Sequence, residues 1–368
     1  MSHKKMLALL MTSVSLLVAL GIGYAGWRWF DAYPHRHISD SEELIEIEIP
    51  RGASFAEVVQ ILYRHRLIEK PTLFRFYTLW EHGSITVQQG TYQFRRNDTP
   101  AQIVSKLKTG PRLFLVSVTI PEGKTYLEIA QLLAQANVAD EAELRAGMKN
   151  PEWLKEMEIP GTTMEGYLFP ETYRFRRNTP VKKVLMTFIN QHKKVWNQLV
   201  RTHQTGLRRL QGKFGFSKHQ IVIMASLVEK ETGVPAERPL IAGVFFNRLS
   251  LPSFPSRLLQ TDPTIIYGCT VGEPRSAACQ EFKGRIRRIH LIDKDNPYNT
   301  YTHPGLPVGP ICNPGRASLQ AVFEPRDTKY LYFVAKTPGG EHHFSETIEE
   351  HNRAVAKYIL KQGDKSNE

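Results

Sequence analysis

Glu231 is the residue of this sequence best placed to act as an acid. It lies near the end of an apolar run, IVIMASLVEKETG, that covers residues 221–233. On a helix, Glu231 extends the apolar stripe formed by Met224, Leu227 and Val228, whereas Glu229 points roughly 160° away. Apolar surroundings and the negative end of a helix both disfavour an ionised carboxyl, so Glu231 could hold a proton near neutral pH and act as a general acid.

The same stretch leaves an alternative open. Glu229 has a partial stripe of its own, formed with Val222, Ala225 and Ser226. A Glu-Lys-Glu sequence is also typical of a solvated last helical turn, so periodicity favours Glu231 only weakly. Gly233 suits a left-handed helix cap and Pro235 follows it, which predicts that the helix ends here with Glu231 in its last turn.

The loops that follow are rich in the residues that bind sugars. They lie in segments 258–268, 298–315, 329–335 and 339–352, which are dense in Asn, Thr, Gln, Tyr, Gly and Pro. Amides and hydroxyls can bind sugar hydroxyls, and flat rings can cover the apolar faces of sugars. These segments therefore predict a carbohydrate cleft, with a set of rigid turns as the alternative.

The N-terminal segment has the composition of a membrane anchor. Residues 6–30 contain one charged residue, Arg28, and such a run is long enough to span a bilayer as a helix. Lys4 and Lys5 favour a cytoplasmic tail at residues 1–5, with the bulk of the chain outside. A cleaved signal peptide with a weak site near Gly23 and Ala25 is the alternative.

A polar linker, residues 31–43, leads to a strand that begins at Leu44 with alternating isoleucines. Ser54 and Glu57 then have the spacing of a capping box, which predicts the start of a helix.

This pattern recurs further along the chain. Residues 49–58 are similar to residues 120–129, and the segment GTYQFRRNDTP from Gly90 is similar to ETYRFRRNTP from Glu171. Two related strand–turn–helix units are expected, since a solenoid would need more and shorter repeats. The first, residues 44–110, resembles a LysM domain, a small module that binds N-acetylated sugars. The second unit and a connecting region make up residues 111–210.

Composition excludes several classes of protein. The chain has 368 residues, and its net charge of +12 would suit nucleic acid, an anionic membrane or an acidic polymer. The basic pairs are scattered and no recognition motif is present, so no nucleic-acid partner is expected. Three cysteines and dispersed histidines show no zinc spacing, so neither a metal nor another cofactor is expected.

Five motifs, taken in order, resemble those of the YceG-like endolytic murein transglycosylases. The motifs are Val228-Glu-Lys-Glu-Thr232, Phe246-Asn-Arg-Leu249, Leu259-Gln-Thr-Asp-Pro-Thr264, Tyr298-Asn-Thr-Tyr301 with Gly305-Leu-Pro307, and Tyr330-Leu-Tyr-Phe-Val334. The resemblance covers nearly the whole chain. Two departures affect local loop shape: Val308 stands where a second proline is common, and residues 269–292 form a longer basic insertion.

The resemblance implies an α+β protein with an N-terminal transmembrane helix, a LysM-like strand/helix module and a mixed α/β catalytic domain at residues 211–362, followed by a tail at 363–368. It implies a single-pass inner-membrane enzyme, largely periplasmic, that meets peptidoglycan synthases. The enzyme would cut nascent peptidoglycan strands internally, between N-acetylmuramic acid and N-acetylglucosamine, leaving 1,6-anhydro-N-acetylmuramic acid ends. Glu231 would be the catalytic acid, and Gln260, Asn299 and Tyr301 are the candidates for binding the sugar.

A single carboxyl suffices for this reaction. Ordinary glycosidases use two carboxylates, but here the sugar's own C6 hydroxyl closes on C1. Glu231 would first protonate the leaving oxygen and then accept the proton of that hydroxyl. If the enzyme were instead a hydrolase, Asp262 would be the candidate for the second carboxylate. The rival from another class is a non-catalytic, LysM-like scaffold protein that binds peptidoglycan for the wall-synthesis machinery.

In an oxidising compartment such as the periplasm, cysteines can form disulfides. Cys269 and Cys279 flank a short segment containing Gly and Pro, and we expect them to form a disulfide that closes this loop. Cys312 would remain free.

Overall fold

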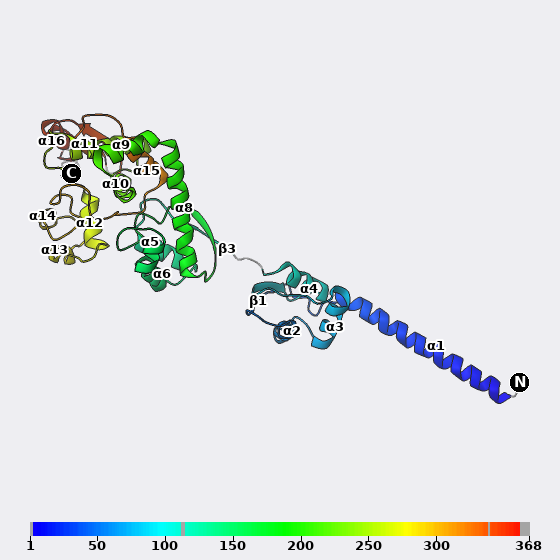
Figure 1. Ribbon diagram of the computed structural model, residues 1–368. Coiled ribbons are helices and arrows are strands. Elements are labelled where there is room, and N and C mark those ends of the chain that lie inside the picture. Colours follow the sequence, from blue (N-terminus) through cyan, green and yellow to red (C-terminus); the bar gives the residue numbers. More distant parts are fainter. Residues whose placement is uncertain (1–2, 112–114, 338, 361–368) are drawn as a thin grey trace. The chain divides into compact units, whose positions relative to one another are not determined.

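The computed structural model describes residues 3–111, 115–337 and 339–360. The chain divides into two compact units, unit 1 up to residue 114 and unit 2 from residue 115 onward (Figure 1). Both units combine helices with small antiparallel sheets of two strands. The fold is therefore mixed α/β. Among the residues whose side chains are described, no helix is both long and apolar enough to cross a membrane.

Unit 1 contains the first strand–turn–helix repeat. In chain order its elements are α1 (His3–Ala32), η1 (Tyr33–His35), β1 (Leu44–Ile49), α2 (Phe55–Arg64), α3 (Pro71–His82), β2 (Gly90–Arg95) and α4 (Pro100–Thr109). Strand β1 pairs with β2 so that Ile47 lies opposite Tyr92, and both side chains are buried. The predicted capping box is present, because Ser54 accepts from the backbone of Glu57 and the Glu57 side chain accepts from Ser54.

Unit 2 opens with the second repeat. Its first elements are β3 (Leu115–Thr119), α5 (Tyr126–Gln135), α6 (Glu141–Met148), α7 (Pro151–Glu156) and β4 (Thr172–Arg176). Strands β3 and β4 pair antiparallel as β1 and β2 do, and Thr125 and Glu128 form the matching capping box. Each unit therefore contains a strand, a turn with a capping box and a helix in the same order.

The remaining elements of unit 2 are mostly helical. They are α8 (Val181–Thr202), α9 (Gln204–Phe214), α10 (Lys218–Glu231), η2 (Pro235–Glu237), α11 (Arg238–Ser250), α12 (Asp262–Thr270), α13 (Ala277–Gln280), α14 (Arg288–Leu291), α15 (Arg316–Phe323), β5 (Tyr332–Ala335), β6 (His342–Ser345), α16 (Ile348–Val355) and η3 (Ala356–Leu360). One hydrophobic core runs from Val118 to Phe323, so residues 111–210 and 211–362 contribute to the same core from Val118 onward.

Helix α10 lies in the middle of this core. Every residue from Ile221 to Val228 is buried, and the helix contacts α11, α12 and α15. A helix that is covered on all sides needs no polar face, which explains why the apolar run carries only a weak periodicity. Figure 1 shows α10 among neighbouring helices of unit 2.

The cysteines are arranged as predicted. Cys269 and Cys279 form a disulfide that joins α12 to α13, while Cys312 is free and buried. The bond closes a satellite core in which the two cysteines pack with Ile265.

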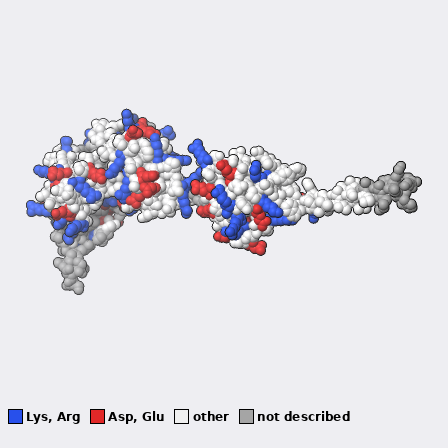
Figure 2. All heavy atoms as spheres, turned by 90° about the horizontal axis from the view of Figure 1, so that it is seen from below, with Lys and Arg blue, Asp and Glu red and all other residues white. Residues whose placement is uncertain are grey.

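Surface charge is mixed rather than concentrated. In the view of Figure 2, basic and acidic side chains alternate over both units, without a continuous basic stripe on the face shown. This distribution agrees with the scattered basic pairs of the sequence.

Candidate active site

Helix α10 brings Glu231 to the edge of the core of unit 2. The helix starts at a capping box formed by Ser217 and Gln220 and ends at Glu231, so the glutamate lies in the last turn as predicted. The predicted left-handed cap at Gly233 is wrong. Thr232 already leaves the helix with an extended backbone (φ −145°), and Gly233 does not adopt a positive φ.

The surroundings of Glu231 favour its protonated form. Burial raises the pKa of Glu231 to about 7, and the nearby charge of Asp262 acts in the same direction. The Thr261 hydroxyl and the Arg248 guanidinium act in the opposite direction and are outweighed. A carboxyl with a pKa near 7 can both donate and accept a proton under physiological conditions.

Glu229 lies in a different environment. Its carboxylate is 3.2 Å from Arg238 and accepts a hydrogen bond of 2.9 Å from the Gly315 amide. The side chain is only 5% exposed, so it is held in an ion pair rather than solvated. The two glutamates therefore differ in their partners.

A constrained loop brings Thr261 and Asp262 near Glu231. Gln260 has a left-handed backbone (φ 53°), and its amide donates to the Thr300 carbonyl over 3.1 Å. Arg248 donates to the carbonyls of Leu259 and Leu331, which ties this loop to the segment before β5. Strained backbone of this kind is often found at functional sites. The Gln260 side chain is exposed and free to meet a ligand.

The hydroxyl of Thr261 is available to a ligand or to the acid. Its oxygen is buried and has no hydrogen-bond partner of good geometry among the described residues. Because this hydroxyl opposes the rise in the pKa of Glu231, it lies close to the carboxyl. Buried hydroxyls normally have a partner, and for this hydroxyl the Glu231 carboxyl is close enough to serve as one.

Tyr301 also belongs to the surroundings of the acid. Its hydroxyl donates to Asp262 over 2.7 Å. Burial and Asp262 raise the pKa of Tyr301, and the charge of Glu231 contributes to the same shift. Tyr301 thus remains a neutral hydrogen-bonding group near the glutamate.

Asn299 is placed differently from the other predicted sugar-binding residues. Its side chain is fully buried and donates to the carbonyls of His290 and Asp293, over 3.0 and 2.7 Å. Its own oxygen accepts from the Tyr301 amide. This geometry makes Asn299 a support of the loop that presents Tyr301, and leaves no amide group free for a sugar.

A cavity of about 420 Å³ opens beside Glu231. It is lined by Glu122, Gly123, Lys124, Glu128, Glu229, Lys230, Glu231, Thr232, Gly233, Arg238 and Gly339. The second repeat therefore forms one wall, through the turn before α5. Within the described parts of the chain, no three His, Cys, Asp or Glu side chains form a group that could hold a metal.

Sequence reasoning missed a group that fixes the end of α10. The Thr232 hydroxyl donates to Glu237 over 3.2 Å, and the other side of Glu237 meets His342, whose ring nitrogen Nδ1 and backbone amide each lie 2.7 Å from a carboxylate oxygen. Strand β6 is thus tied to the residue that follows Glu231. The partners are too far apart in sequence for any local pattern to have found them.

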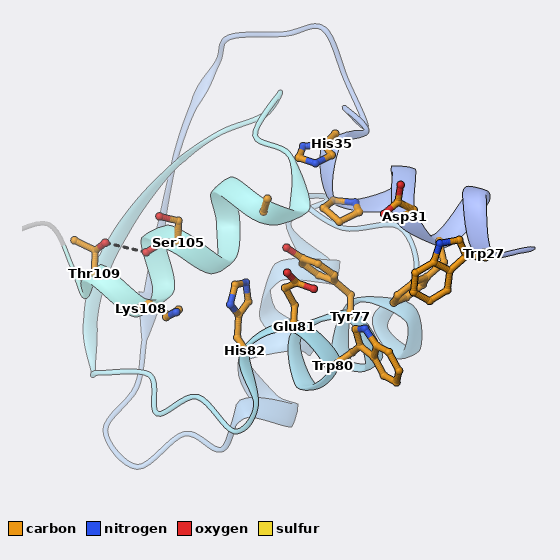
Figure 3. Close-up of a pocket in the computed structure, with 13 residues that line it drawn as sticks. Trp27, Asp31, His35, Tyr77, Trp80, Glu81, His82, Ser105, Lys108 and Thr109 are labelled. Atoms are coloured by element: carbon orange, nitrogen blue, oxygen red, sulfur yellow. Dashed lines mark hydrogen bonds between the residues drawn. The ribbon is translucent and has the colours of Figure 1, made fainter.

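Unit 1 has a pocket of its own, of about 620 Å³, where the end of α1 meets α3 and α4 (Figure 3). The rings of Trp27, Tyr77 and Trp80 and the carboxylates of Asp31 and Glu81 line it. These groups could bind a ligand, but the nucleophile or acid that cleavage requires is better matched by Glu231 in unit 2.

Comparison with known proteins agrees with this arrangement. The chain matches the YceG-like family over residues 47–357. It is 32% identical over 341 residues to the endolytic murein transglycosylase of Bacillus subtilis (strain 168), covering 89% of this chain and 88% of that protein. It is 26% identical to the endolytic murein transglycosylase of Streptococcus pneumoniae serotype 2 (strain D39 / NCTC 7466), covering 94% of this chain but only 65% of that protein.

A solved structure is also similar. The 2.6 Å crystal structure of a YceG-like protein from Listeria monocytogenes aligns with a TM-score of 0.53 and 30% identity, over 85% of this chain and 99% of the crystallised one. The family match spans both repeats and every element around Glu231. On these grounds, the chain belongs to the YceG-like family.

Proposed function

We propose that this protein is an endolytic murein transglycosylase. It cleaves peptidoglycan strands internally between N-acetylmuramic acid and N-acetylglucosamine and leaves 1,6-anhydro-N-acetylmuramic acid ends. The names of the relatives support the reaction class. The observation that carries the proposal is Glu231, a carboxyl with a pKa raised to about 7 at the edge of a polar cavity.

Glu231 serves as both acid and base. In its protonated form it gives its proton to the glycosidic oxygen as the bond to C1 breaks. The resulting carboxylate takes the proton of the C6 hydroxyl, which closes on C1 of the same sugar. The tethered hydroxyl has a large effective concentration, so no water needs activation. The proton balance closes, and Glu231 is again protonated.

The groups around the acid position the sugar. Gln260 offers an exposed amide, and Thr261 offers a buried hydroxyl that interacts with the Glu231 carboxyl. Tyr301 presents a ring held by its bond to Asp262. Asn299 supports this arrangement from behind the loop. Asp262, occupied by Tyr301, is not required as a second catalytic carboxylate.

Residues 6–30 attach the protein to the inner membrane, with residues 1–5 in the cytoplasm and the bulk of the chain in the periplasm. The low charge of this segment supports the proposal. The disulfide is consistent with an oxidising compartment. There the enzyme would meet nascent strands and peptidoglycan synthases, and the LysM-like unit 1 would add affinity for the glycan.

A non-catalytic scaffold is the second candidate. A binding module gains nothing from a carboxyl kept protonated by burial, and the raised pKa of Glu231 therefore favours an enzyme. Digestion of purified glycan strands separates the two. New anhydro ends, each lighter by one water than a reducing end, support the transglycosylase, whereas strands that bind without being cut support the scaffold.

A further inference from the structure

A second pocket, of about 530 Å³, lies in unit 2 between α5, α12 and the end of α10. Its lining is largely apolar and includes Leu127, Ile266 and Val271. Ile266, a large aliphatic side chain, is 41% exposed. An exposed apolar surface beside a catalytic cleft suggests a ligand that covers it.

This pocket continues the cavity of the catalytic acid. Glu128 and Lys230 line both. Lys230 directly precedes Glu231, and Pro263 in the pocket directly follows Asp262. A substrate held in the cavity therefore has the pocket directly beside it.

The rim of the pocket carries positive charge. Lys230 lies at its junction with the catalytic cavity, and Arg145 lines it from α6. One end of the Arg145 guanidinium meets Glu141, but its Nε is buried and has no partner among the described residues. Glu128 is offset by Lys124, which lies 2.7 Å from it. Arg145 and Glu128 are thus each paired with an opposite charge, which leaves Lys230 as the cation that can meet a ligand, and it suits a carboxylate.

We infer that this pocket receives the peptide stem of the substrate, an inference that rests on the proposed function. The stem begins at the lactyl group of the muramic acid whose C1 is attacked, so it leaves the cleavage site close to Glu231. It carries small apolar side chains and free carboxylates, which match the apolar floor and the cationic rim. The enzyme is accordingly selective for strands that still bear their peptides.

The test compares kcat/KM on two substrates, strands with peptide stems and the same strands after the stems have been removed by an amidase. The full chain should cut the stem-bearing strands about tenfold better, as expected for burial of one or two aliphatic groups. Ile266→Asp should bring the ratio of the two values close to one. Ile292→Asp serves as the matched control, because Ile292 is 62% exposed but does not line the pocket.

A second variant tests the charged rim. Lys230→Gln should lower the ratio for stems with free carboxylates and leave it unchanged for stems whose carboxylates are amidated. A wild-type ratio near one, or an unchanged ratio in Ile266→Asp, would overturn the inference while leaving the proposed function intact. Failure of the wild type to cut either substrate would instead reject the proposed function, and the stem inference with it.

Discussion

Glu231 and Glu229 lie two residues apart on α10, and their partners decide their roles. Glu229 is neutralised by Arg238 and the Gly315 amide, whereas Glu231 has no cation in direct contact among the described residues. Desolvation without a paired cation keeps a carboxyl protonated. The residue pattern alone favours Glu231 only weakly, because the partners of Glu229, Arg238 and the Gly315 amide, lie outside α10 and become visible only in the folded chain.

The pH dependence of the reaction follows from the pKa of Glu231. In the proposed reaction the protonated form of Glu231 is the active acid. Burial raises its pKa to about 7, so activity should be retained at pH 6 and decline above about pH 7. For a single proton the decline approaches tenfold per pH unit. A profile of kcat/KM against pH, recorded with soluble glycan fragments as substrate, measures this decline. A rate that stays level to pH 9 would contradict the assignment.

At the scale of elements, much of the fold could be predicted because its signals are local. The capping boxes at Ser54 and Thr125 each depend on a residue three positions later. The two repeats can be recognised because their amino-acid sequences are similar to each other. The disulfide closes a short segment. Asn299 was assigned to the sugar because an exposed amide and a buried one look alike in sequence. Its three carbonyl partners become visible only in the folded loop.

Strand β6 controls the end of α10 through Glu237. His342→Ala removes a partner of the Glu237 carboxylate, so Glu237 should fix Thr232 less firmly. We expect kcat to fall by about tenfold or more, because a small displacement of the neighbouring Glu231 would slow the reaction. KM should change little. The pH above which activity declines should shift, because the groups around Glu231 are held less firmly.

The neighbouring histidine provides a matched control. His343→Ala removes a ring that packs against Tyr358 at 5.7 Å and has no contact with Glu237. Equal losses of kcat in the two variants, with unchanged pH profiles, would show that strands β5 and β6 affect activity only through the stability of the fold.

Helix α8 carries a histidine that should make stability depend on pH. His192 is buried without a hydrogen-bond partner among the described residues, and burial lowers its pKa to about 3. The unfolded chain, with a pKa near 6.5, then binds the extra proton, so stability is fully present above about pH 6.5 and is lost as pH falls toward 3. The loss approaches about 1.4 kcal/mol per pH unit.

Urea unfolding at pH 5 and pH 7 measures this contribution. His192→Phe should reduce the difference between the two values, whereas the exposed His303→Gln should leave it as in the wild type. If the free energy of unfolding changed equally between pH 5 and pH 7 in His192→Phe and in the wild type, His192 would not be the cause of the change.

At the scale of the whole molecule, the sequence predicts an anchored enzyme, and retention of the anchor can be measured. Residues 6–30 should remain attached in the mature protein, because their apolar length exceeds a typical signal-peptide core and no strong cleavage site ends them. Intact mass of protein extracted from membranes measures this. A mature N-terminus near Gly26 would contradict it and favour a cleaved leader.

The central claim is that Glu231 alone supplies the acid, and substitution of the two glutamates tests it most directly. Glu231→Gln keeps the shape of the side chain but has no proton to give, so it should fold and bind glycan while cleavage falls by about 10²- to 10⁴-fold or more. Glu229→Gln weakens an ion pair and should lower stability by about 2 kcal/mol, with far smaller loss of activity in the folded fraction. New strand ends, identified by mass, are the measurement. Wild type and Glu229→Gln should produce anhydro ends, and Glu231→Gln almost none. An active Glu231→Gln beside an inactive, folded Glu229→Gln would contradict the role of Glu231 as the acid.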